Sequence, residues 1–196
     1  MGTPVDDAAL DTLFRTARSQ NKWLDKPVSP EQLIAIYDLM KWGPTSANSF
    51  PSRIVLVTSQ ESKKRLAAVV FEGNRPKVMT APATAIIGFD SQFYDLLPRL
   101  FPHRDMRSAF VDKPEFAQVS AFRNSSLQGA YFMLAARAIG LDCGPMSGFD
   151  NESVDREFFS GGRVKSNFIC AIGYGDPSAV FERLSRPSFS EVCEIV

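Results

Sequence analysis

The sequence predicts an α+β fold in which helices cover a sheet, and two observations indicate it. Segments with apolar residues at helical spacing recur along the chain, and short apolar runs rich in β-forming residues stand between them. This alternation favours a mixed sheet packed under helices. The length of 196 residues suits one substantial core. Because the chain contains no internal repeat, low-complexity segment or linker, we expect residues 1–196 to form a single domain.

Two helices are expected before residue 45. The first runs from about Asp6 to Ala17, and we expect its apolar stripe to be buried. The stripe consists of Leu10, Leu13, Phe14 and Ala17. The second helix begins at Ser29, which can form a capping box with Gln32, and the Gly-Pro pair at 43–44 ends it. Its apolar face consists of Leu33, Ile36, Tyr37 and Met40.

The remaining elements follow from the same two patterns. Strand candidates are the apolar runs Ile54 to Thr58, Thr84 to Phe89 and Ser166 to Ile172. Helices are expected from about Glu61 to Phe71 and, as the longest, from about Ser120 to Ile139, where Gly140 ends the helix. The apolar stripe of this long helix can lie in the core or in an interface between subunits.

The segment from Ser91 to Gln118 differs from the rest of the chain. Aromatic residues alternate there with prolines and basic residues, the aromatic ones being Phe93, Tyr94, Phe101, Phe110 and Phe116. Such an excursion can wall an active site, or it can hold a satellite hydrophobic cluster under a long loop. The sequence leaves both interpretations open.

Charge and hydropathy narrow the range of partners. The 22 basic and 22 acidic residues balance, and neither sign forms a long block, so nucleic acid and membrane surfaces are not expected as partners. No apolar stretch approaches the ~20 residues that span a bilayer, and the N-terminus is acidic, so we expect a cytoplasmic protein. Three widely spaced cysteines and one histidine, His103, suggest neither a disulfide framework nor a metal site. His103 can act as a base, but its place in a loop favours a solvated side chain.

Several common catalytic signatures are missing. The chain has no Gly-x-Gly-x-x-Gly after a strand, no Walker loop and no Gly-x-Ser-x-Gly elbow, so we expect neither a Rossmann-type nucleotide site nor a serine hydrolase triad. At the end of the first helix, however, Arg18 and Ser19 can donate charge-assisted hydrogen bonds to a phosphate. An arginine at a helix end can equally serve only to complement the helix dipole.

A second polar segment follows the second helix. From Lys41 to Pro51 a tight Gly-Pro turn leads into hydroxyl and amide side chains, which can face a ligand or can simply cap the turn. The segment resembles the nitroreductase family, in which a Pro-Ser/Thr-Ser-x-Asn sequence of one subunit contacts the flavin of its partner. The matching residues are Pro44, Thr45, Ser46 and Asn48.

The resemblance extends along nearly the whole chain. Asn74 and Lys77 are similar to the family's asparagine and lysine beside the ribityl chain and the pyrimidine edge of the flavin, where a cation stabilises the charge of the reduced ring. Arg183 and Arg186 are similar to the family's phosphate-binding residues near the C-terminus. The family's Pro-x-Glu-Gly-Phe loop, whose backbone lies against the flavin, is matched by Pro145, Met146, Ser147 and Gly148.

Some runs resemble a narrower group within the family, the malonic semialdehyde reductases of pyrimidine degradation. These runs are Lys41 to Asn48, Ala121 to Ser126, Gly144 to Asp150 and Lys165 to Asn167. The sequence also departs from the wider family. Ser147 replaces the usual glutamate, and Ala17 and Asn21 stand where many members have basic residues.

The resemblance implies a nitroreductase-like fold with a mostly antiparallel sheet, doubled in a homodimer that binds FMN. NADH or NADPH would deliver a hydride, and a small aldehyde or a nitro or quinone compound would then accept it, with ping-pong kinetics. In the narrower group, malonic semialdehyde becomes 3-hydroxypropionate. Candidates for its carboxylate are Arg104, Arg107 and Arg123, and candidates for the proton donor are water, Ser147 and Tyr94. A flavin-binding protein without turnover is the competing class.

Overall fold

The computed structural model describes residues 2–196, and a single four-stranded sheet lies at its centre. The strands are β1 (Ser52–Val57), β2 (Ala83–Asp90), β3 (Asp142–Met146) and β4 (Val164–Gly173), in the order β1-β2-β4-β3. All three strand pairs are antiparallel, so the antiparallel sheet implied by the resemblance is confirmed and the mixed sheet is wrong. The alternation of helical and apolar segments predicts where strands occur, but it does not determine whether neighbouring strands run parallel or antiparallel.

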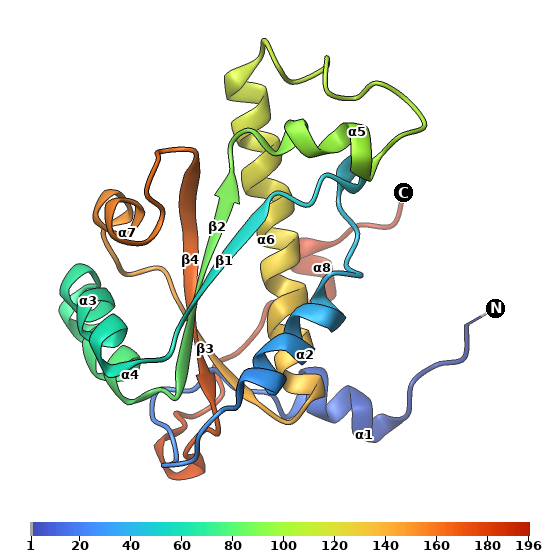
Figure 1. Cartoon of the computed structure of the whole chain (residues 1–196). Coiled ribbons are helices and arrows are strands. Elements are labelled where there is room, and N and C mark those ends of the chain that lie inside the picture. Colours follow the sequence, from blue (N-terminus) through green and yellow to red (C-terminus); the bar gives the residue numbers. More distant parts are fainter. Residues whose placement is uncertain (1) are drawn as a thin grey trace.

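Helices cover both faces of the sheet, as Figure 1 shows. On one face lie α2 (Pro30–Met40) and α6 (Pro114–Ala138), and on the other lie α3 (Gln60–Val69), α4 (Arg75–Thr80) and α7 (Asn151–Phe158). One apolar cluster fills each interface, with Ile36, Ile87 and Phe132 on the α2 and α6 side and Leu66, Ile86 and Val154 on the other. The expected α+β fold is therefore confirmed.

The start of α2 follows its sequence signals closely. The Ser29 hydroxyl accepts a hydrogen bond from the Gln32 N–H at 3.3 Å, and the Gln32 side chain accepts one from the Ser29 N–H at 3.0 Å, which completes the capping box. Leu33, Ile36 and Met40 are buried as expected, whereas Tyr37 is exposed. The apolar face of α2 therefore extends beyond the surface that is buried against the rest of the chain.

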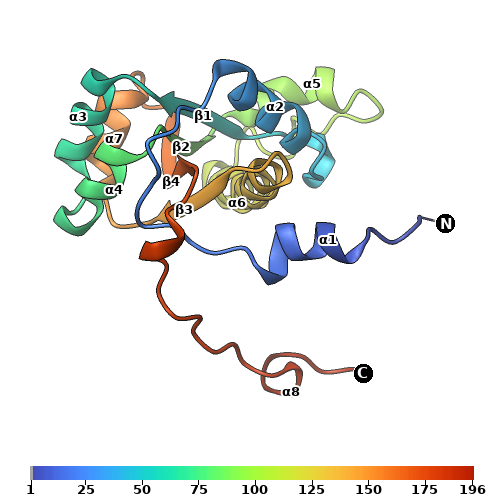
Figure 2. The same cartoon turned by 90° about the horizontal axis from the view of Figure 1, so that it is seen from below.

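The first helix is present, but the expectation that it buries a stripe is wrong for a single chain. It comprises α1 (Asp7–Leu10) and a π-helical turn, η1 (Asp11–Arg15), and neither contains a buried residue. Phe14 in particular is exposed. Figure 2 shows the reason, because α1 lies below the helix and sheet layers.

Among the elements that pack on or in the sheet, β3, α4 and α7 were not expected from the sequence, and α6 begins earlier than expected. Strand β3 contains Gly144 and Pro145, which disfavour strands, so its pairing with β4 must stabilise it. Helix α6 begins at Pro114, well before Ser120, because proline suits the first turn.

The aromatic excursion forms a cluster of its own, which supports the second interpretation of this segment. It contains η4 (Phe93–Leu96) and α5 (Leu97–Leu100). The buried members of its cluster are Phe89, Phe93, Leu97, Phe110, Ala117 and Ala121, with Ala47 packed against them. Phe116 is exposed and stacks on Phe110 at a centroid distance of 5.2 Å.

The C-terminal residues leave the body of the molecule. After η5 (Pro177–Ala179), every residue from 181 to 196 is exposed, including α8 (Phe189–Val192), and Figure 2 shows this arm running away from the sheet. Among the described helices, none is both long and apolar enough to span a membrane.

Candidate functional site

A basic cleft lies between the end of the first helix and the start of the C-terminal arm. Its volume is about 610 Å³. Four of the residues that line it are arginines, and only one is acidic, Glu182. The complete lining is Phe14, Ala17, Arg18, Ser19, Asn21, Arg137, Phe181, Glu182, Arg183, Leu184 and Arg186. The structure therefore brings together Arg18, Ser19, Arg183 and Arg186, the four predicted phosphate ligands.

Arginine side chains also hold this cleft in shape. Arg18 donates to the carbonyl oxygen of Phe181 in the arm, and Arg183 donates in return to the carbonyl oxygens of Arg15 and Ala17 at 2.8 and 3.1 Å. Arg137, which the sequence reasoning missed, donates to the carbonyl oxygen of Leu13 at 3.2 Å. A guanidinium has five N–H donors, so each of these arginines keeps donors for an anion.

Beside the cleft, the chain at Ser19 and Gln20 covers the outer edge of β3. The N–H of Gln20 donates to the carbonyl oxygen of Cys143 at 2.9 Å, and Ser19 forms a parallel bridge with the same residue. Beside it, a Cβ atom on Gly144 would lie 2.5 Å from the Gln20 carbonyl oxygen and 3.2 Å from Cδ of Lys77. Glycine is thus required here for the chain after Arg18 and the Lys77 stem to meet at the strand.

Lys77 is a half-buried cation at this edge. Burial lowers the pKa of Lys77, because its charged form loses hydration, while the Cys170 thiol acts weakly in the opposite direction. Lys77 forms no ion pair within residues 2–196. A negatively charged group bound beside it would therefore favour the charged form of Lys77.

The loop after β3 presents backbone groups. The carbonyl oxygen of Gly148 accepts hydrogen bonds from the Phe71 N–H and from Nδ2 of Asn74, both at 2.9 Å. The N–H groups of Ser147 and Gly148 make no hydrogen bond to any residue that the structure describes. The Met146 side chain is buried in the core. Asn74 thus fixes a loop whose two N–H groups and Ser147 hydroxyl remain available.

The predicted loop at 44–48 has an unusual backbone. Ala47, Asn48 and Phe50 have φ values of 51°, 49° and 45°, which cost energy in residues other than glycine and require surrounding contacts. The Asn124 side chain supplies one, because it accepts the Ser46 N–H at 2.8 Å. The hydroxyl of Thr45 accepts the Phe50 N–H at 3.3 Å.

This loop lies far from the basic cleft within one chain. Asn124, which holds the loop, precedes Arg137, which lines the cleft, by 13 residues on the same helix, a rise of about 20 Å. Pro44, Ser46 and Asn48 are nevertheless exposed. The structure thus divides the predicted residues into two groups. One is the loop from Pro44 to Asn48, and the other consists of the cleft residues together with Asn74, Lys77 and Pro145 to Gly148.

The other reactive side chains form no further site. His103 is exposed and packs edge-on against Phe101, with ring centroids 5.6 Å apart. Cys143 and Cys170 are buried free thiols, and Cys193 is exposed. Within residues 2–196, no group of three or more histidine, cysteine or acidic side chains could hold a metal ion.

Four arginines that line one cleft next to the edge of β3 offer guanidinium donors that suit an anionic ligand. Residues 14–175 match the model of the nitroreductase family, and the chain belongs to this family. It is 56% identical over 195 residues to a protein of Stenotrophomonas maltophilia with the provisional name NADH dehydrogenase/NAD(P)H nitroreductase, and the match covers 100% of both chains. A Rhodopseudomonas palustris protein with the same provisional name is 54% identical over 196 residues, again with 100% of both chains covered.

Solved structures agree on the fold. A nitroreductase-type protein of Bacillus subtilis superposes with a TM-score of 0.86 at 24% identity, with 97% of this chain and 100% of the other covered. A nitroreductase-type protein of Exiguobacterium sibiricum, solved in complex with FMN, superposes with a TM-score of 0.85 at 21% identity, with 100% and 99% covered.

Proposed function

We propose that this protein is an FMN-dependent oxidoreductase that takes a hydride from NADH or NADPH and passes it to a small acceptor. The observation that carries the proposal is the arginine-lined cleft at Arg18 and Ser19, whose next residue, Gln20, meets β3 at the glycine that also packs against the Lys77 stem. Family membership and the FMN bound to the Exiguobacterium protein support the same cofactor.

The residues present fit FMN group by group. Arg18, Ser19, Arg183 and Arg186 would hold its phosphate, since guanidinium and hydroxyl donors suit phosphate oxygens. The N–H groups of Ser147 and Gly148 would face acceptor atoms of the ring. When bound, FMN accepts a hydride at N5 and gives it up again.

The chain itself contributes positioning and charge. Lys77 would stabilise the negative charge of a reduced ring, and Asn74 would hold the Gly148 loop in place. No nucleophile or metal is needed, because the binding contacts set the distance and angle of hydride transfer. Ser147 is the exposed hydroxyl on this loop, so it is the side-chain proton donor to test before Tyr94, which packs on Phe93 in the excursion.

The proposed enzyme is a homodimer. A compact monomer of 21.7 kDa would expose roughly 9,200 Å² of surface, whereas this chain exposes 11779 Å². Trp42 and Phe181 are 79% and 75% exposed, and α6 exposes several large apolar side chains. These are Phe116, Val119, Phe122, Leu127 and Tyr131. A partner subunit would cover these surfaces and would bring its Pro44 to Asn48 loop to the flavin.

A charge on the exposed face of α6 is therefore expected to abolish the dimer and FMN binding together. Leu127→Asp places a carboxylate in the proposed interface, while Leu127→Met keeps its volume and polarity. Light scattering after size exclusion should find the first variant monomeric and colourless, and the second dimeric and yellow. A Leu127→Asp protein that stays dimeric would show that this face is not the interface.

Two acceptor classes remain, and each has its own support. Of the three candidate arginines, Arg107 already pairs with Asp95 at 3.3 Å, whereas Arg104 and Arg123 have no ion-pair partner among the described residues. A free guanidinium favours malonic semialdehyde, whose carboxylate it can bind. Arg123 also lines an apolar groove of about 750 Å³ together with Phe89 and Phe122. This groove lies on the face of α6 that the partner subunit would cover, and its aromatic rings favour a flat nitro or quinone compound held between the subunits. Comparing kcat/KM for malonic semialdehyde and a nitroaromatic separates the two.

If malonic semialdehyde is the acceptor, Arg104→Ala or Arg123→Ala should raise its KM roughly 10- to 150-fold, the value of one charge-assisted hydrogen bond. The KM for an uncharged nitroaromatic should not change. Arg156→Ala, which removes an exposed guanidinium from α7, is the matched control. Equal effects on both acceptors in every variant would exclude a carboxylate-binding role for these arginines.

A further inference from the structure

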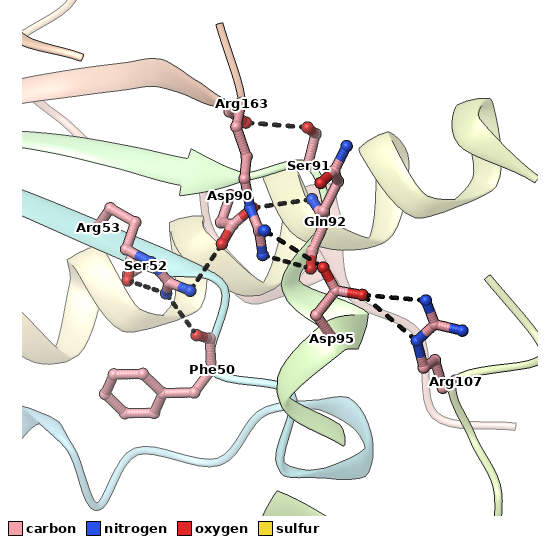
Figure 3. A network of polar contacts seen from close by, with 9 residues as sticks. All are labelled: Phe50, Ser52, Arg53, Asp90, Ser91, Gln92, Asp95, Arg107 and Arg163. Atoms are coloured by element: carbon pink, nitrogen blue, oxygen red, sulfur yellow. Dashed lines mark hydrogen bonds and ion pairs between the residues drawn. The ribbon is translucent and has the colours of Figure 1, made fainter. Parts of the chain in front are cut away.

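A network of charged side chains joins the ends of three strands to two loops, as Figure 3 shows. At its centre is Asp90, the last residue of β2, which is 2% exposed. Its carboxylate accepts hydrogen bonds from Arg53 at 2.7 Å and from Arg163 at 2.6 Å, and also from the Gln92 N–H at 2.9 Å. The hydrogen bond to Asp90 raises the pKa of Arg163.

On one side the network reaches the strained loop. While Nη2 of Arg53 contacts Asp90, Nη1 donates to the carbonyl oxygens of Phe50 and Ser52 at 3.2 and 2.9 Å. Phe50 has a positive φ and is the last residue of the Thr45 to Phe50 loop before Pro51. Arg53 can hold that carbonyl only while Asp90 orients its guanidinium, since a free arginine samples many rotamers.

On the other side the network reaches the aromatic excursion. Arg163 donates from Nη2 to the carbonyl oxygen of Gln92 at 2.8 Å and from Nη1 to Asp95 at 3.2 Å. Asp95 in turn accepts from Arg107 at 3.3 Å. The first turns of the excursion are therefore tied to β4 through Asp90 and Arg163.

The two segments also touch each other. Nδ2 of Asn48 donates to the carbonyl oxygen of Leu100 at 2.9 Å, and Ala47 packs on the aromatic cluster. A displacement of one segment must therefore move the other.

We propose that Asp90 is a positioning residue that sets the loop 45–50 and the excursion 91–113 as one unit, and that it thereby acts on the FMN site of the partner subunit. The last step rests on the proposed function, whereas the positioning does not. Both segments depend on the same buried carboxylate, because Asp90 binds two guanidinium groups and each guanidinium holds a different segment.

Asp90→Asn tests this with little change in shape. The amide can still accept one hydrogen bond but loses the charge that orders both arginines, and these side chains are exposed enough to hydrate, so the chain should fold. Asp155→Asn is the matched control, since Asp155 is another mostly buried carboxylate that accepts a backbone N–H, from Ser166 at 2.7 Å, but contacts neither segment.

Hydrogen exchange of the apo protein, followed by mass spectrometry, should become at least about tenfold faster in 45–50 and 91–101 of Asp90→Asn, and should stay unchanged there in Asp155→Asn. Arg53→Lys loses the fork that bridges Asp90 to Phe50, so it should accelerate exchange in 45–50 more than in 91–101. FMN affinity, measured by flavin fluorescence, should fall about tenfold in Asp90→Asn.

Unchanged exchange in either segment, or an increase spread over the whole chain, would overturn the positioning role. Faster exchange in both segments with unaltered FMN affinity would overturn its link to the cofactor site. A wild-type protein that binds no FMN would instead refute the proposed function, and the exchange measurement would still decide the positioning role by itself.

Discussion

Removing both Arg18 and Arg183 is expected to weaken FMN binding by about a thousandfold. Each guanidinium would give a phosphate at least one charge-assisted hydrogen bond, which contributes about 1.5–3 kcal/mol, or roughly 10- to 150-fold in affinity. The two arginines also tie the arm to the first helix, so the cleft itself should widen when both are lost. Fluorescence titration of the apo protein with FMN measures the change in Kd.

Arg15→Ala is the control for this double variant. Arg15 lies beside the cleft, but its side chain pairs with Asp7 and Asp11 and does not line the cavity. Its removal should leave the Kd within about twofold, as for an exposed ion pair. If the Arg18→Ala, Arg183→Ala protein bound FMN as tightly as wild type, the basic cleft could not be the phosphate site.

A methyl group at Gly144 is expected to damage both stability and cofactor binding. The added Cβ would lie 2.5 Å from the Gln20 carbonyl oxygen, and a backbone atom cannot move away as a flexible side chain could. Overpacking of this kind costs about 3 kcal/mol, so Gly144→Ala should lower Tm by about 9 °C. The displaced segment carries Ser19, and the Lys77 stem packs beside the same glycine. FMN affinity should therefore fall as well.

Gly73→Ala makes the same chemical change where a Cβ atom would meet nothing within 4 Å. Thermal unfolding should place this control within about 2 °C of wild type, in keeping with an exposed substitution. A Gly144→Ala protein that melted together with the control and kept its FMN affinity would mean that the chain at Gln20 does not pack against β3 as described.

Much of the fold could be predicted from local patterns. The capping box of Ser29 and Gln32, the glycine after the long helix and the apolar runs of β1, β2 and β4 all depend on neighbouring residues, and the structure places them as expected. Strand β3 could not be found in this way, because its glycine and proline are tolerated only through pairing with β4. The direction of the strands likewise depends on tertiary pairing.

The site residues likewise divide into those that the sequence predicts and those that depend on tertiary contacts. Arg18, Ser19, Arg183 and Arg186 could be selected from the sequence as phosphate ligands, and they meet in one cleft. Arg137 and Asn124 were missed as site residues, since both lie inside the long helix and acquire a role only through segments that fold against it. The left-handed backbone at Ala47 and Phe50 had no signal, because glycine, the usual marker of positive φ, is absent there.

Anaerobic stopped-flow absorbance of the FMN-loaded protein tests most directly whether FMN bound beside β3 relays a hydride. NADH or NADPH should bleach the flavin absorbance, and malonic semialdehyde or a nitroaromatic, mixed in afterwards, should restore it. The Arg18→Ala, Arg183→Ala protein should show neither phase at FMN concentrations that saturate wild type. A wild-type protein that holds FMN but is bleached by neither nicotinamide would contradict the account, and would identify a flavin-binding protein without turnover.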